Sequence, residues 1–216
     1  APASLILTNY FLPLNEALAV QGSSVKYLLL FTSLVFSNLC IADKWGSPEL
    51  ISALSEDSTI VVRVIPGEGF LNHDSKSSEK AFAKAQYFKW NGSNAYDIYQ
   101  SITLKNPAAP IQVLVAGDGT LITIDNWYST GSGKVVVIYA PNGELIKEYE
   151  LTELFPDKSD FDNLGRSVSS IQWRCLDLQP DLRYGYLYVP HILGGSLRFD
   201  LKTGVLDKIK PDSKCE

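Results

Sequence analysis

The sequence predicts a mainly β protein made of antiparallel sheets, in a propeller-like, sandwich or barrel arrangement with a short N-terminal helix. The prediction starts from residues 111–151, where two consecutive β-hairpins are rich in Val, Ile and Tyr, which suit a half-buried pleated surface. The dipeptides Asp118-Gly119 and Asn142-Gly143 supply the positive φ angles that tight hairpin turns require. The four strands of this unit are expected at 111–116, 120–125, 134–140 and 144–151.

Further strands are expected on both sides of this central unit. The alanines of 81–90 also suit a helix, but the Asn91-Gly92 turn that follows favours a strand, with 96–104 as its hairpin partner. Asn91-Gly92-Ser93 is also a formal glycosylation sequon, for which the turn is the favoured interpretation. The expected strands are short β-branched and aromatic runs that end at Gly, Pro or Asn, at 59–65, 81–90, 96–104, 167–176, 184–190, 195–201 and 205–209.

Helical signals are short and local. Ser47 suits an N-cap, Pro48 the first helical turn and Glu49 the positive end of the helix dipole, so the N-terminal helix is expected at 47–55. Residues 152–155 are expected to form one helical turn. The acidic stretch 156–165 lacks the ligand spacing of a calcium loop and is expected to be solvated.

The N-terminal part of the chain predicts export. Lys26 precedes about a dozen mostly apolar residues and small side chains at −3 and −1, which is typical of a signal peptide at 25–42, cleaved after Ala42. The run is shorter than the roughly twenty apolar residues of a membrane span, and the alternatives are a buried core segment or an uncleaved anchor. Because the chain contains no Met, residues 1–24 are expected to be upstream or unstructured sequence. Residues 43–216 are expected to form a single β-rich domain, periplasmic or secreted.

A similar sequence pattern closes three segments of the chain, at 96–104, 135–151 and 196–209. Each closes an antiparallel unit, and the last two contain a polar-Gly turn followed by an aliphatic strand. Propeller blades repeat at about 40–50 residues with four strands each, but three blades do not close a ring. A compact barrel or sandwich, or a piece of a longer array, accounts for the same signals, because turns at such intervals occur in any antiparallel protein.

Several short motifs carry a resemblance to a known family: Asn106-Pro107, Ala109-Pro110, Asp118-Gly119, Asp125-Asn126-Trp127, Asn142-Gly143 and the run from Ser167 to Arg174. On these residues, the segment 81–204 resembles uncharacterised secreted bacterial β-rich proteins with propeller-like hairpin repeats. The resemblance implies a secreted β-rich fold. It brings no established activity, so no site residue is taken from it.

Composition and missing motifs exclude several functional classes. The net charge of −5 and the scattered Lys and Arg argue against nucleic acid and against anionic membrane surfaces, so membrane contact is expected only through an uncleaved signal segment. The sequence lacks a phosphate loop, a His-Glu-x-x-His motif and a Gly-x-Ser-x-Gly nucleophile elbow. With two histidines a multi-histidine metal site is excluded, and no metal or cofactor is expected. A Ser-His-Asp triad needs only one histidine, so catalysis stays open at His191, which follows an expected strand.

One strand end and the loop after it are the strongest candidate for binding. A carboxylate, an amide and two aromatic rings precede a flexible Ser/Gly loop; such loops on rigid sheets commonly bind ligands, and aromatics beside amides suit glycans or peptides. Arg174 could pair with Asp125, either at a ligand or as a structural ion pair. In the structural alternative, Trp127 packs over the sheet edge and the polar residues cap the turn. The candidate binding residues are Asp125, Asn126, Trp127, Tyr128, Arg174 and His191.

Two cysteines, Cys175 and Cys215, remain after signal-peptide removal. An even count in an exported protein predicts a disulfide that pins the C-terminal tail to a central strand. The loop-entropy estimate gives such a bond about 3–4 kcal/mol of stabilisation. In a cytosolic chain both residues would be thiols.

These observations predict an exported, non-catalytic protein that binds an unknown protein, peptide or glycan ligand through loops at one end of its sheets. The alternative is an exported hydrolase that uses acidic residues or His191. A third interpretation is a structural subunit of a larger β assembly. An enzyme should show a concave pocket with convergent polar groups, an interaction module an exposed apolar patch, and a structural subunit long unpaired edge strands.

Overall fold

The computed structural model describes residues 45–69, 79–209 and 215. The expected upstream segment 1–24 and the expected signal peptide 25–42 lie outside these residues. None of the helices in the described part is both long and apolar enough to span a membrane.

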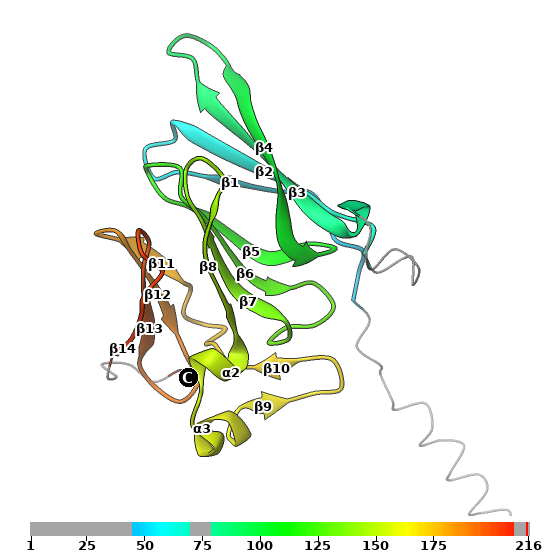
Figure 1. The fold of residues 1–216 in the computed structure, drawn as a ribbon, viewed down its shortest axis with the longest axis vertical. Coiled ribbons are helices and arrows are strands. Elements are labelled where there is room, and N and C mark those ends of the chain that lie inside the picture. Colours follow the sequence, from blue (N-terminus) through cyan, green and yellow to red (C-terminus); the bar gives the residue numbers. More distant parts are fainter. Residues whose placement is uncertain (1–44, 70–78, 210–214, 216) are drawn as a thin grey trace, which may run out of the picture. The chain divides into compact units, whose positions relative to one another are not determined.

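Three four-stranded antiparallel sheets make up most of the described chain (Figure 1). In each of them the strands are hydrogen-bonded in chain order, which is the meander of a propeller blade. Sheet 1 comprises β1 (Ile51–Leu54), β2 (Ile60–Ile65), β3 (Phe82–Trp90) and β4 (Tyr96–Pro107). Sheet 2 comprises β5 (Pro110–Val115), β6 (Leu121–Asn126), β7 (Lys134–Tyr139) and β8 (Leu145–Glu150). Sheet 3 comprises β11 (Asp181–Arg183), β12 (Tyr186–Pro190), β13 (Ser196–Asp200) and β14 (Leu206–Ile209).

Smaller elements connect these sheets. A two-stranded sheet pairs β9 (Gly165–Arg166) with β10 (Ile171–Gln172), and a 3₁₀ turn, η3 (Glu79–Ala81), leads into β3. The helices are α2 (Leu151–Leu154) and α3 (Lys158–Asp162). The mainly β, antiparallel fold class predicted from the sequence is confirmed, and so are the four strands of the central unit.

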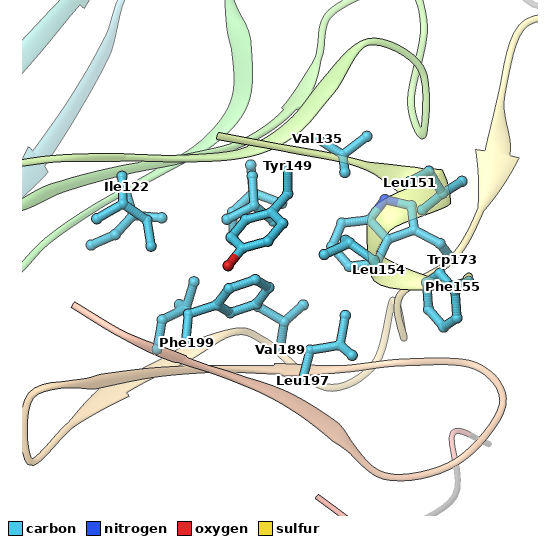
Figure 2. Close-up of a cluster of buried hydrophobic side chains, with 14 of the residues drawn as sticks. Ile122, Val135, Tyr149, Leu151, Leu154, Phe155, Trp173, Val189, Leu197 and Phe199 are labelled. Atoms are coloured by element: carbon cyan, nitrogen blue, oxygen red, sulfur yellow. The ribbon is translucent and has the colours of Figure 1, made fainter. Parts of the chain in front are cut away.

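Sheet 2 is buried on both faces, because sheet 1 covers one and sheet 3 the other. Side chains alternate along a strand, so neighbours on β7 enter different cores: Val136 packs towards sheet 3 and Val137 towards sheet 1. This explains the uninterrupted apolar run of β7, since a strand buried on both faces loses the usual polar alternation. Figure 2 shows the core between sheets 2 and 3, where Ile122 and Tyr149 face Val189 and Phe199.

The predicted N-terminal helix at 47–55 is wrong. Residues 45–50 form no regular element, and β1 pairs with β2 in the register Ile51↔Val64 to Leu54↔Val61. The pairing lets Ile51 and Ala53 pack against the core of sheets 1 and 2. A helix of nine residues is below the length at which helices are stable alone, so tertiary pairing outweighs the local capping signals.

The long strand predicted at 167–176 is also wrong. Ser167 and Ser170 form a turn, and only the two residues of β10 pair as a strand. Beyond β10 the chain leaves that sheet and runs beside the end of β12, where the Cys175 amide donates to Pro190 O and the Ile192 amide to Trp173 O. The sequence reasoning also missed α3 and the short strand β11.

Candidate functional site

The carboxylate of Asp125, at the end of β6, is completely buried and anchors the predicted site. Its Oδ1 accepts hydrogen bonds from the Trp173 indole (2.8 Å) and from the Gly131 amide (3.0 Å). Its Oδ2 accepts one from Arg174 Nε at 3.0 Å, which confirms the pairing suggested by the sequence. Charge-assisted hydrogen bonds of this kind are about twice as strong as neutral ones.

The loop after β6 closes over this carboxylate. A side chain at Gly131 would collide with the backbone of Ile171, so only glycine lets the amide of residue 131 approach Asp125. Thr130 O also accepts a hydrogen bond from the Ile171 amide at 2.9 Å. The Ser/Gly loop, which the sequence presents as flexible, is therefore tied down at several points.

Asn126 forms a second, neutral network beside Asp125. Its Nδ2 donates to Ser132 O (2.6 Å) and Lys134 O (3.2 Å), and its Oδ1 accepts from Asn106 Nδ2 (2.9 Å). Asn106 Oδ1 in turn accepts from the Thr123 hydroxyl at 2.7 Å. These are the contacts of the structural alternative, in which the polar residues cap the turn. A role of Asp125, Asn126 and Arg174 in binding stays a prediction.

Trp127 and Tyr128 form an aromatic cluster with Trp45. The ring centroids of Trp45 lie 5.9 Å from those of Trp127 and 6.2 Å from those of Tyr128, in edge-to-face geometry. The Trp127 indole also donates to Gly46 O at 2.8 Å. All three rings are half-buried. Trp45 was not predicted, because its contact with Trp127 and Tyr128 joins segments about 80 residues apart in the chain.

His191 follows β12 and pairs with Arg174 as an isolated β-bridge. Its ring packs against Phe155 with the centroids 5.5 Å apart, and its buried Nδ1 has no hydrogen-bond partner in the described part of the chain. Burial, and then the charge of Lys208, lower the pKa of His191, while Asp160 acts in the opposite direction. Because a catalytic histidine is oriented by a hydrogen bond to one ring nitrogen, this environment does not favour a triad.

The predicted disulfide between Cys175 and Cys215 is present, with a Cα–Cα distance of 5.5 Å. Among the described residues, Cys175, Asp177 and Cys215 form a group whose potential ligand atoms lie within 4.8 Å of one another. Metal-binding cysteines are thiolates, and these two sulfurs are bonded to each other. The group is therefore a disulfide with a neighbouring acid.

A cleft of about 1130 Å³ opens where the first strands of the three sheets come together. It is lined by residues of β1, β5 and β11, each of which is the edge strand of its sheet. Apolar side chains such as Val113 and Leu182 form its walls, and Glu56, Arg183 and Lys202 bring charges of both signs. None of the six predicted binding residues lines it.

Tyr184 projects at this cleft from the two-residue turn between β11 and β12 and is 92% exposed. Tyr184 and Gly185 both have positive φ angles, of 53° and 79°. A two-residue hairpin turn with two positive φ angles is of type I′, where Asn-Gly is strongly preferred and a tyrosine is costly. The Tyr-Gly pair between two strands is the sequence signal that could have identified this position.

Comparisons with known proteins give structural likeness only. No family model matches the chain, and neither does any curated protein. A crystal structure of HIRA(644-1017) is similar over 79% of this chain and 42% of its own, at 8% identity and a TM-score of 0.41. BamB from Moraxella catarrhalis is similar over 76% of this chain and 50% of its own, at 17% identity and a TM-score of 0.32. The chain thus spans about half the length of these structures or less.

Proposed function

We propose that this chain is an exported, non-catalytic binding protein that holds an extended peptide segment of a partner in the cleft between β1, β5 and β11. The observation that carries the proposal is Tyr184, an exposed aromatic side chain held in a strained turn at the cleft. Strained positions persist where function compensates for their cost, and tyrosine is among the residues that dominate binding energy at interfaces.

The size and edges of the cleft favour a peptide over a small molecule. Its volume of about 1130 Å³ is larger than the roughly 300–1,000 Å³ of small-molecule sites. Three edge strands border it, and an edge strand can hydrogen-bond to the backbone of an added extended peptide. Apolar walls with charges of both signs suit the mixed side chains of a peptide.

The hydrolase alternative receives less support from the geometry. Neither His191 nor the ion pair of Asp125 and Arg174 lines the cleft, and Asp125 is completely buried. A general acid or base has to reach the proton that it transfers, directly or through one water molecule. A binding role therefore fits the accessible part of the molecule better.

The test is selection of random twelve-residue peptides on phage against the immobilised wild-type protein. We expect enriched peptides to lose binding to Tyr184→Asn, while the same substitution raises the free energy of unfolding by about 1 kcal/mol, because Asn tolerates the left-handed turn. Val168→Ala, at a fully exposed position outside the cleft lining, is the control and should bind as the wild type does. The absence of enriched peptides, or equal binding to Tyr184→Asn, would refute the proposal.

A further inference from the structure

The outer face of sheet 1, turned away from sheet 2, carries a continuous apolar row across all four strands. The strand registers pair Leu54 with Val61, Val61 with Phe88 and Phe88 with Ile98, so these side chains lie side by side on one face. Leu54, which also lines the cleft at the edge strand β1, and Ile98 are each 54% exposed. On the same face, Trp90 and Tyr96 form the next pair, with ring centroids 5.2 Å apart.

The outer face of sheet 3 has the opposite character. Its charged and aromatic side chains are paired with one another: Arg183 lies over Tyr188 at 4.3 Å and Arg198 over Tyr186 at 4.8 Å. Arg198 also forms an ion pair with Asp207 at 2.7 Å. Such a face suits water, as the polar outer faces of terminal repeats do in stacked proteins. The two ends of the sheet stack therefore differ in chemistry.

We propose that the outer face of sheet 1 packs against the same face of a second copy of this chain, with a two-fold axis along the apolar row. Exposed apolar patches bordered by polar residues mark interaction surfaces. Packing the row against the paired charges of sheet 3 would instead remove water from those charges, which is unfavourable. A two-fold axis along the row places each apolar side chain opposite its own counterpart.

Complementary chemistry on the two sides of the row supports this choice of partner. On β3, Trp90 and Gln86 lie two residues to either side of Phe88, so the pair Trp90–Tyr96 lies on one side of the row. Arg63 pairs with Gln86 and is exposed on the other side. Rotation about the row brings Arg63 of one copy opposite Thr59 of the other, one strand away from Trp90, so that the long arginine side chain can lie over the indole in a cation–π contact.

The first test is the mass of the full chain by sedimentation equilibrium over a range of concentrations. We expect a dimer for the wild type, a monomer for Ile98→Glu, and a dissociation constant roughly 5–30-fold higher for Arg63→Ala, which loses two such contacts. Val205→Glu is the matched control, because Val205 is similarly exposed (57%) but lies at the turn before β14 of sheet 3. Circular dichroism confirms that each variant is folded.

The second test addresses the geometry. Because the axis places the two Ile98 side chains opposite each other, Ile98→Cys in a Cys40→Ser background should cross-link to a dimer with a short bismaleimide. Val205→Cys in the same background should not. A wild-type monomer at all concentrations, a dimer unaffected by Ile98→Glu, or equal cross-linking of both cysteine variants would overturn the proposal. None of the substituted residues Arg63, Ile98 and Val205 lines the cleft, so these outcomes are distinguishable from a failure of peptide binding.

Discussion

The two faces of sheet 2 are joined to their neighbours by different chemistry. Towards sheet 3, an apolar core is accompanied by the buried ion pair between Asp125 and Arg174, and the disulfide between Cys175 and Cys215 ties the segment before sheet 3 to the chain after it. Towards sheet 1, the core is apolar, and the polar links include the hydrogen bond from the Lys105 amide to the Tyr139 hydroxyl at 2.7 Å and a partly exposed ion pair between Lys105 and Glu148 at 3.9 Å.

This difference indicates which of the two interfaces should lose stability when the pH or the redox conditions change. Burial raises the pKa of both Tyr87 and Tyr139 well above the usual range, so the phenols of the interface between sheets 1 and 2 stay neutral. On the sheet 3 side, His191, whose pKa is lowered by burial, responds to pH, and the disulfide responds to reductant. The stability of sheet 3 is therefore expected to depend on pH and on reductant, whereas sheet 1 is held mainly by apolar burial.

The largest effect is expected from Asp125→Ala. The substitution leaves the guanidinium of Arg174 buried without its carboxylate and should lower the free energy of unfolding by about 3–5 kcal/mol, measured by urea denaturation. Asp181→Ala is the control, because its ion pair with Arg183 is largely exposed and should contribute at most about 1 kcal/mol. Equal losses for the two variants would mean that the buried pair does not anchor this interface.

Removal of the disulfide should come next. The double variant Cys175→Ser and Cys215→Ser opens a loop of 40 residues, which corresponds to about 4 kcal/mol in the loop-entropy estimate. Amide hydrogen exchange should then accelerate in β11 to β14 before it changes in β1 to β4. Uniform acceleration over all three sheets would show that sheet 3 is not a separate unit of stability.

Two neighbouring valines on β7 allow the interfaces to be compared directly. Val136→Ala and Val137→Ala each delete two buried methyl groups and should each cost roughly 2–3 kcal/mol. The loss of unfolding free energy in the double variant Asp125→Ala/Val136→Ala should differ from the sum of the two single losses, because Val136 packs in the core towards sheet 3. Val137→Ala, which faces sheet 1, should add independently. Coupling of equal size in both pairs would contradict a division between the interfaces.

The sequence predicted best where local pattern and tertiary packing agree. The turns at Gly119 and Gly143 have the positive φ angles expected of them, and the strands of sheet 2 follow the predicted hairpins. The predicted helix at 47–55 failed because β1 gains a paired neighbour and a buried face, which capping signals cannot report. Strand pairing between distant segments is not encoded in a short window of sequence.

The candidate site could be predicted only in part, for a related reason. Asp125 and Arg174 were correctly paired because opposite charges on expected strands favour contact, but their burial depends on how the segment after β10 leaves its sheet. Tyr184 and Trp45 were missed, since the cleft and the aromatic cluster join segments far apart in sequence. The Tyr184-Gly185 pair can be read from the sequence, but it is recognised as a hairpin turn only once the strand β11 before it is known.

The smallest effect is expected from pH and concerns His191. Its pKa is lowered in the folded protein, so the unfolded chain takes up the proton more readily as the pH falls below about 6.5. The stabilising contribution is thus complete above that pH and is lost as the pH falls towards the lowered pKa of the folded state. From about pH 7.5 to about pH 5, the unfolding free energy of the wild type should fall more than that of His191→Asn. The extra loss should appear as faster exchange in sheet 3 amides, because His191 packs on Phe155 beside that sheet. Parallel pH profiles for the two proteins would show that His191 does not make the stability of this interface depend on pH.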